Sequence, residues 1–389
     1  MSLPPSGKWN YPTAVRFGAG RIAELPAALA ELGVRRPLLV TDPGLAALPM
    51  VGAAAAACTA AGLPTAVFSD VQGNPVGRNV DDGVAAYRAH GADGVIAFGG
   101  GSALDVGKAV ALMVGQSRPL FDYEDRDDWF TRINPDGMAP VVAVPTTSGT
   151  GSEVGRASVI TDESVHTKKI IFHPKMLPGR VICDPALTLG LPPHLTAWTG
   201  IDALSHLLEA WCAPGFHPLA DGIALEGMRL VHESLIAAFH DGQDIVARSH
   251  LMAASAMGAT AFQKGLGGMH AMAHPIGAVV GAHHGLTNAV VMPYVLAFNR
   301  GALVERGARL ARYLGLPGHD FDALLGWVLA LRTETGIPHT LAEIGVQEAQ
   351  LPLLARMSVE DPSAGGNPTP WSLAAAETVF ARAFSGDLG

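Results

Sequence analysis

Residues 94–108 read GVIAFGGGSALDVGK, and this stretch determines the fold of the N-terminal half of the chain. The apolar run at 94–98 is typical of a buried strand, whereas residues 105–114 have the composition of a helix. Three glycines and a serine join the two segments. Glycine lets a backbone approach a phosphate closely, and the N–H groups at a helix start favour negative charge. A pyrophosphate would fit this turn, although a tight turn without a ligand would explain the same residues.

The sequence on either side repeats the alternation of short apolar runs and alanine-rich segments. It predicts further strands at 37–40, 65–68 and 141–144, and helices at 51–61 and 80–90. Successive βαβ units of this kind predict a parallel sheet wrapped by helices. The ligand of such a sheet is expected outside the carboxyl ends of its strands.

After about residue 184 the strand signals stop and helical spacing takes over. Helices are predicted at 200–211, 219–239, 245–263, 269–280 and 303–314. The chain is therefore divided into an α/β domain, residues 1–186, and an all-helical domain, residues 187–389. The active site is expected in a cleft between the two domains.

Composition narrows the class of protein. Of the 389 residues, 49% are hydrophobic and only 16% are charged, which excludes a disordered chain. The net charge of −9 argues against binding to nucleic acid, because that needs clustered Lys and Arg. Residues 99–101 and Pro293 interrupt the longest apolar stretches, so no membrane-spanning helix is expected. The lack of a secretory signal and three isolated cysteines predict a cytoplasmic protein.

A second polar turn follows the predicted strand at 141–144. Residues 145–153, PTTSGTGSE, combine a run of hydroxyl side chains with two glycines. Such a composition suits the phosphate or ribose groups of a nucleotide. The alternative is a loop whose hydroxyls bind their own backbone. Beside the first glycine turn, a nucleotide cofactor shared by both turns is the better interpretation.

The most informative pattern contains acidic and histidine side chains. Asp202 and His206 are four residues apart, His270 and His274 are four apart, and His284 follows. On a helix a spacing of four places two side chains on one face. One carboxylate and three imidazoles suit Fe²⁺ or Zn²⁺, with a position left for a substrate oxygen. Most of the 15 histidines are better explained as core or surface residues, but the cluster of histidines between 267 and 285 is harder to dismiss.

These motifs resemble those of the iron-containing, or group III, alcohol dehydrogenases. The resemblance rests on residues 17–20 (FGAG), 99–108 (GGGSALDVGK), 145–154 (PTTSGTGSEV), 200–206 (GIDALSH) and 269–293. It implies an α/β dinucleotide-binding domain followed by an all-α metal-binding domain, a dehydroquinate synthase-like architecture. It also implies an NAD-linked alcohol dehydrogenase that transfers hydride between a metal-bound primary alcohol or aldehyde and nicotinamide C4.

The resemblance also implies roles for single residues. Asp202, His206, His270 and His284 would bind Fe²⁺ or Zn²⁺, and His274 would relay a proton. The residues expected to bind NAD are Asp42, Asn74, Gly100, Gly101, Ser102, Thr146, Thr147, Thr150, Lys168 and Leu189. The expected partners are a small alcohol or aldehyde substrate and further copies of the chain, in a homodimer or a higher homo-oligomer.

Asp42 bears on the choice between NAD and NADP. A carboxylate at this position can accept hydrogen bonds from the adenosine ribose and would repel a 2′-phosphate, which favours NAD. The same side chain could instead cap the helix that Pro43 begins, and both roles could hold together.

Two departures from the family pattern concern the site. His283 replaces a proline that often precedes the last ligand, so a swap between His283 and His284 is conceivable; the 14-residue distance from His270 favours His284. Arg156 lies in a predicted strand beyond the second turn. If it points inward, an acidic substrate such as a semialdehyde becomes attractive, and if it points outward it is a solvated charge or a salt-bridge partner.

Other functions on the same fold stay open. A maleylacetate reductase or a 4-hydroxybutyrate-type dehydrogenase would share the architecture, as would glycerol dehydrogenase and dehydroquinate synthase. The complete set of one aspartate and three histidines disfavours the maleylacetate reductase, glycerol dehydrogenase and dehydroquinate synthase alternatives. A noncatalytic nucleotide-binding subunit is the alternative from another class, and the intact ligands argue against it.

Overall fold

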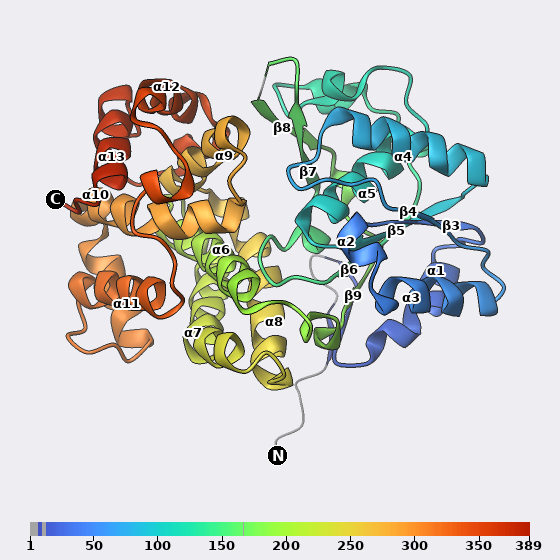
Figure 1. Cartoon of the computed structure of the whole chain (residues 1–389), viewed down its shortest axis with the longest axis horizontal. Helices are drawn as coiled ribbons and strands as arrows, with labels where there is room; N and C mark the ends of the chain where they lie inside the picture. Colours follow the sequence, from blue (N-terminus) through green and yellow to red (C-terminus); the bar gives the residue numbers. More distant parts are fainter. Residues whose placement is uncertain (1–6, 10–12, 166) are drawn as a thin grey trace. The chain divides into compact units, whose positions relative to one another are not determined.

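The computed structural model describes residues 7–9, 13–165 and 167–389, which form two compact units (Figure 1). One unit contains the described residues up to Thr147 together with Gly151–Gly190. The other contains Ser148–Thr150 and Leu191–Gly389. The predicted division after residue 186 falls a few residues before this boundary, and the roles of the two domains stay a prediction.

The first unit is built on a seven-stranded sheet in the described part of the chain. Its strand order is β1-β2-β9-β6-β5-β3-β4, and all neighbouring pairs are parallel except β1 with β2. The strands span Gly7–Trp9 (β1), Val15–Phe17 (β2), Pro37–Val40 (β3), Ala66–Phe68 (β4), Gly94–Gly99 (β5), Val141–Pro145 (β6) and Arg180–Cys183 (β9). The four predicted strands are β3 to β6. The other three, β1, β2 and β9, were not predicted.

Helices cover both faces of this sheet, which explains why its central strands read as continuous apolar runs. On one face, Leu39, Ile96 and Phe98 form a core with α1 (Leu25–Glu31) and α3 (Pro49–Ala60). On the other face, α5 (Gly101–Met113) lies against β5, and α4 (Gly77–His90) packs beside α5. The approach of α5 is close, since a Cβ added to Gly107 would lie 2.6 Å from the Ala97 Cβ.

A buried ion pair attaches a small hairpin to α5. The hairpin consists of β7 (Ala157–Asp162) and β8 (Thr167–Phe172), paired antiparallel. Lys108 Nζ lies 3.3 Å from the Asp105 carboxylate and donates to the carbonyl oxygens of Ser152 and Ala157. Asp105 in turn accepts from the Val159 N–H at 2.9 Å. A buried ammonium is tolerated only with such partners, so the segment after the second polar turn is held on the helix that follows the first.

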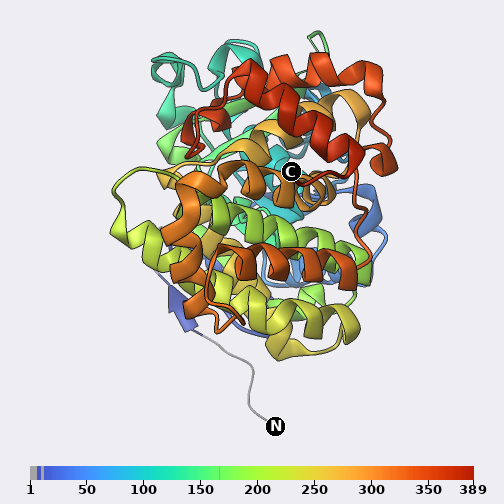
Figure 2. The same cartoon turned by 90° about the vertical axis from the view of Figure 1, so that its left-hand side faces the viewer.

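The second unit is entirely helical in its described residues, as predicted. Its helices are α6 (Pro193–Cys212), α7 (Pro218–His240), α8 (Ile245–Ala261), α9 (Gly268–Val280), α10 (His284–Tyr313), α11 (Phe321–Glu334), α12 (Leu351–Glu360) and α13 (Leu373–Ser385). From Thr196 onward nearly every residue of α6 is buried, because α7, α8 and α10 all pack against it. Figure 2 shows α12 and α13, at the red end of the sequence colours, packed side by side.

Three helices start four or more residues before the predicted start. One is α6, which begins at Pro193 and not at residue 200. The predicted helix at 303–314 is only the end of α10, which begins at His284 and contains Pro293. Proline normally indicates a helix end, but this one is buried in the middle of the helical core, where tertiary packing overrides propensity. Helix α5 likewise starts at Gly101 and not at residue 105, so the glycine turn forms its first residues. No helix among the described residues is long and apolar enough to cross a bilayer.

The buried carboxyl group of Glu153 predicts a pH-dependent stability. Its side chain is in the second polar turn, and burial raises its pKa to about 7, against opposing effects of its own backbone and Lys108. When the pKa of a carboxyl is higher in the folded state than in the unfolded state, the free energy of unfolding falls as pH rises between the two pKa values. For Glu153 this range is about pH 4.5 to 7. Glu153→Gln keeps the neutral form at every pH. We expect this variant to gain about 1–3 kcal/mol of unfolding free energy relative to wild type between pH 5 and pH 8.

Urea unfolding at both pH values measures this difference. The exposed Glu348→Gln serves as the matched control and should show no such change. An equal difference between Glu153→Gln and wild type at pH 5 and pH 8 would contradict the prediction.

Candidate metal centre and cofactor turns

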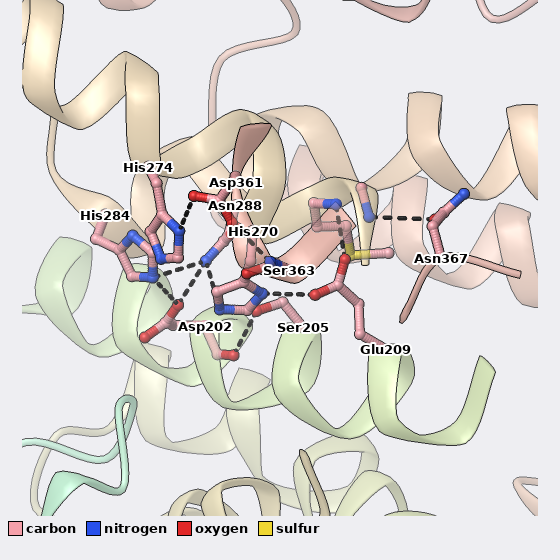
Figure 3. Close-up of polar contacts among 12 residues, drawn as sticks. Asp202, Ser205, Glu209, His270, His274, His284, Asn288, Asp361, Ser363 and Asn367 are labelled. Carbon is pink, nitrogen blue, oxygen red and sulfur yellow. Dashed lines mark hydrogen bonds and ion pairs between the residues drawn. The ribbon is translucent and has the colours of Figure 1, made fainter. Parts of the chain in front are cut away.

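Four side chains from three helices of the second unit converge. Helix α6 contributes Asp202 and His206, which its turn places on one face, while α9 contributes His270 and α10 contributes His284. One potential ligand atom from each lies within 4.8 Å of all the others. Three of these residues are buried and His284 is half-buried, so the group is open on one side only. The four sequence-predicted ligand residues are therefore brought together. Figure 3 shows three of them, Asp202, His270 and His284.

The surroundings of this group fit a bound cation. The side-chain amide nitrogen of Asn288 points at three of the ligands: it lies 2.8 Å from Asp202 Oδ1, 3.2 Å from His284 Nε2 and 3.4 Å from His270 Nε2. Its own Oδ1 is buried without a hydrogen-bond partner among the described residues. The amide N–H group of Asn288 thus faces three atoms that can each accept a hydrogen bond. A cation bound by the same three atoms would lie in the space between them. A carboxylate and three imidazoles are a donor set for Fe²⁺ or Zn²⁺.

The protonation of two of the histidines is set by opposite influences. Burial lowers the pKa of His206 to about 4, although Asp202 opposes this shift, so its ring is neutral and able to bind a metal at neutral pH. Burial also acts to lower the pKa of His270, but the carboxylate of Glu209 raises it overall. The Glu209 carboxylate thus favours a proton on the His270 ring, whereas burial favours the neutral ring of His206.

A layer of polar groups lies behind the ligands. Glu209 Oε2 lies 2.6 Å from His270 Nδ1, and its Oε1 accepts from the Met269 N–H at 2.6 Å. Sequence reasoning missed Glu209 and Asn288. A signal existed for both, since Glu209 follows Asp202 by seven residues on α6 and Asn288 follows His284 by four on α10.

His274, the residue expected to relay a proton, lies beside the ligand group. Its ring stacks on that of His284 with the centroids 5.4 Å apart. Its Nδ1 lies 2.8 Å from Asp361 Oδ2, and Asp361 also accepts from the Ser363 N–H at the start of a 3₁₀ turn. Burial acts to raise the pKa of Asp361, but His274 and Ser363 lower it overall, so Asp361 is an ionised partner for the imidazole.

His283 and Arg156 were considered from the sequence, and Phe262 is an additional neighbour of a ligand. His284 belongs to the converging group, whereas His283 caps α10, its Nδ1 accepting from the Leu286 N–H at 3.4 Å. Phe262 packs against His206 with the ring centroids 5.3 Å apart. Arg156 is exposed just before β7, with its guanidinium 5.6 Å from the Phe172 ring.

In the first unit, the two polar turns lie next to each other. Gly100 precedes α5, while Gly101 and Ser102 are its first two residues, so their N–H groups lie at the helix N-terminus. The turn after β6 begins with Thr146, whose N–H donates to the Gly99 carbonyl at 3.0 Å. A Cβ added to Gly100 would lie 3.3 Å from the Thr147 side chain. Parallel pairing of β5 with β6 brings the turns together.

Asp42 lies at the reversal of strand order between β3 and β5, where open α/β sheets bind their ligands. It caps α2 (Pro43–Ala46) by accepting from the Leu45 N–H at 2.9 Å. A Cβ added to Gly99 would lie 3.7 Å from its other oxygen, so Asp42 borders the glycine turn as well. Both suggested roles are therefore geometrically compatible.

The remaining expected nucleotide contacts fall into separate places. Asn74, with φ of 53°, precedes Pro75, and the Pro75 carbonyl accepts a hydrogen bond from the Thr161 N–H. Lys168 is paired with the same Thr161 across the hairpin of β7 and β8. Leu189 ends a 3₁₀ turn after β9, at the same sheet edge as the glycine turn. Thr150 differs from the others, because Ser148–Thr150 belong to the helical unit.

Comparison with known proteins identifies close relatives along the whole chain. A model of iron-containing alcohol dehydrogenases matches residues 12–185, and one of the C-terminal region of the Fe-containing alcohol dehydrogenase family matches residues 196–384. The chain is 43% identical to a 4-hydroxybutyrate dehydrogenase of Cupriavidus necator, covering 87% of this chain and 89% of that one. It is 35% identical to an NAD-dependent methanol dehydrogenase of Bacillus methanolicus, covering 92% and 94%. A solved 1,3-propanediol oxidoreductase has a TM-score of 0.91 at 34% identity, covering 98% and 100%.

The packing of Gly285 predicts how a small change would disturb the ligand group. A Cβ at this position would lie 2.4 Å from the Trp198 carbonyl oxygen and 3.2 Å from the Asp202 Cβ. Gly285→Ala must therefore push the start of α10 away from α6 and separate His284 from Asp202. We expect a loss of about 1–3 kcal/mol of unfolding free energy and weaker metal binding.

Thermal unfolding and a metal titration measure both effects. Gly301→Ala is the control in the same helix, because nothing lies within 4 Å of an added Cβ there. It should leave metal binding unchanged and gain about 0.5–1 kcal/mol. Equal behaviour of the two variants would contradict the prediction.

Proposed function

Because the chain belongs to the iron-containing alcohol dehydrogenase family, we propose that it interconverts a short primary alcohol and its aldehyde with NAD. The family, the fold class, the enzyme class and the use of NAD and iron were expected from the sequence and are confirmed by the matches to both halves of the chain. The observation that supports the proposal best is the convergence of one carboxylate and three imidazoles in the helical unit.

In this proposal each residue of the helical unit has a defined task. Asp202, His206, His270 and His284 hold the metal. When bound, the metal acts as a Lewis acid on the substrate oxygen, and NAD accepts or returns the hydride. His274 exchanges the proton of the alcohol through Nε2, because its Nδ1 is bonded to Asp361.

The residues of the α/β unit bind the cofactor. Gly100, Gly101 and Ser102 present N–H groups to the pyrophosphate, and Asp42 accepts from the adenosine ribose, which favours NAD over NADP. The remaining contacts are proposed for Asn74, Thr146, Thr147, Thr150, Lys168 and Leu189. A location in the cytoplasm and assembly into a homodimer or higher homo-oligomer stay predictions.

A substrate with a terminal carboxylate is the finer proposal. The 4-hydroxybutyrate dehydrogenase is 43% identical to this chain, compared with 35% for the methanol dehydrogenase. Arg156 is the candidate cation for such a carboxylate. The maleylacetate reductase alternative gains no support from the ligand group, because that activity was expected to lack the metal site.

Removal of one ligand tests the metal centre. His270→Ala should weaken metal binding by more than about 100-fold, since even changes behind a ligand cost about 10–100-fold. Turnover of alcohol with NAD, followed by NADH absorbance, should fall with the bound metal, while NAD binding measured by titration should stay. Unchanged turnover would refute the ligand assignment, and NAD binding without any turnover in the wild type would favour the noncatalytic subunit.

Matched substrates test the carboxylate. We expect 4-hydroxybutyrate to have a higher kcat/KM than 1,4-butanediol, which has the same chain length without the charge. Arg156→Met should raise the KM for 4-hydroxybutyrate about threefold to tenfold and leave that for 1,4-butanediol unchanged. An equal effect on both substrates would exclude Arg156 from carboxylate recognition.

A further inference from the structure

We propose that Glu209 is a positioning residue of the metal centre, which selects the nitrogen that His270 offers to the metal and holds the start of α9 in place. This inference rests on the proposed ligand set, in which His270 is one of four ligands. Glu209 itself lies behind the ligands and does not belong to the converging group.

The geometry around Glu209 supports both parts of this role (Figure 3). One carboxylate oxygen lies 2.6 Å from the ring Nδ1 of His270, and the other accepts from the backbone N–H of Met269, also at 2.6 Å. The side chains of Glu209 and His270 are only 4% and 2% exposed, so water does not compete for these bonds. A single carboxylate thus binds the backbone of one residue and the ring of the next.

The bond to the ring determines the tautomer. An ionised carboxylate only accepts hydrogen bonds, so Nδ1 of His270 carries the proton and Nε2 keeps its lone pair. This Nε2 is the atom that lies on the ligand side, 3.4 Å from the Asn288 amide nitrogen that faces Asp202. Glu209 therefore holds the ring in the form and orientation that a metal requires.

The bond to the backbone determines the position of the helix. Helix α9 begins at Gly268, and the first N–H groups of a helix have no partner within it. Glu209 accepts from Met269, while Asn367 Oδ1 accepts from Gly268 at 3.1 Å. Asn367 is fixed in turn by two bonds to Asn299, of 2.8 and 2.9 Å. The helix that contains His270 is thereby attached at its start to α6 and α10.

The origin of Glu209 strengthens the inference. It lies on α6, the helix that also contains Asp202 and His206, at a spacing that places all three on one face. The position of these two ligands relative to His270 thus depends on the bonds of Glu209 as well as on the stacking of the His206 and His270 rings. Gln at this position has the same size but only one acceptor oxygen, so it cannot accept from both Met269 and His270.

Metal affinity, measured apart from activity, tests the proposal. We would remove metal from the full-length protein with a chelator and titrate Zn²⁺ against a chromophoric competitor. For Glu209→Gln we expect a dissociation constant about 10–100-fold above that of wild type. Glu209→Asp keeps the charge but is one methylene shorter, so its loss of Zn²⁺ affinity should be smaller.

Ser205→Ala is the matched control, because this buried hydroxyl on α6 donates only to the carbonyl of Asp202 within the helix. The Zn²⁺ dissociation constant of Ser205→Ala should stay within about twofold of wild type.

Cobalt absorption separates positioning from general stability. Ligand-field bands of bound Co²⁺ should shift in Glu209→Gln, while thermal unfolding confirms that the metal-free variants are folded. The inference would be overturned if folded Glu209→Gln bound Zn²⁺ within about threefold of wild type and its Co²⁺ bands were unchanged. If Glu209→Gln does not fold, unchanged Zn²⁺ affinity and unchanged Co²⁺ bands in Glu209→Asp would overturn it. Failure of the proposed function looks different: His206→Ala would then bind Zn²⁺ as tightly as the wild type.

Discussion

A carboxylate cannot be placed in an apolar core without a compensating partner, and the helical unit is arranged around this constraint. Asp202 lies in the middle of α6, where helices pack from several sides. The groups that face it are imidazoles and one amide N–H, which compensate a buried negative charge only partly. If this group binds a divalent cation as proposed, the cation would complete the compensation, and binding of the metal would stabilise this core.

The α/β unit meets the opposite problem, a buried positive charge. Lys108 is neutralised by Asp105 and by two backbone carbonyls, all of which belong to segments beside the polar turns. At the N-terminus of the same helix, α5, Gly100 and Gly101 leave the backbone uncovered by side chains. One helix therefore presents backbone N–H groups at its beginning and holds the neighbouring turn through the side chains of its second turn.

Sequence reasoning found the features that recur with a period and missed those that depend on tertiary packing. The central strands and five helical segments were predicted because each repeats one pattern over many residues. A strand was predicted at Arg156, one residue before β7, but its partner β8, which starts with the polar residues Thr167, Lys168 and Lys169, was not. Pro293 hid the first half of α10. His206 and His270 were found by spacing and family resemblance. The spacing of Glu209 places it on the same face of α6, but only the packed structure shows that its partners are Met269 and His270.

The tripeptide Ser148–Thr150 lies within the sequence of the α/β unit but belongs to the helical unit. Its middle residue, Gly149, approaches α6 so closely that an added Cβ would lie 2.9 Å from that of Thr199. Consider a chimaera that joins the first 190 residues of one relative to the helical unit of another. Its tripeptide 148–150 would come from the first relative but would have to pack against α6 of the second. Recombination between such enzymes is expected to succeed only where this short insert and the residues around Thr199 are exchanged together.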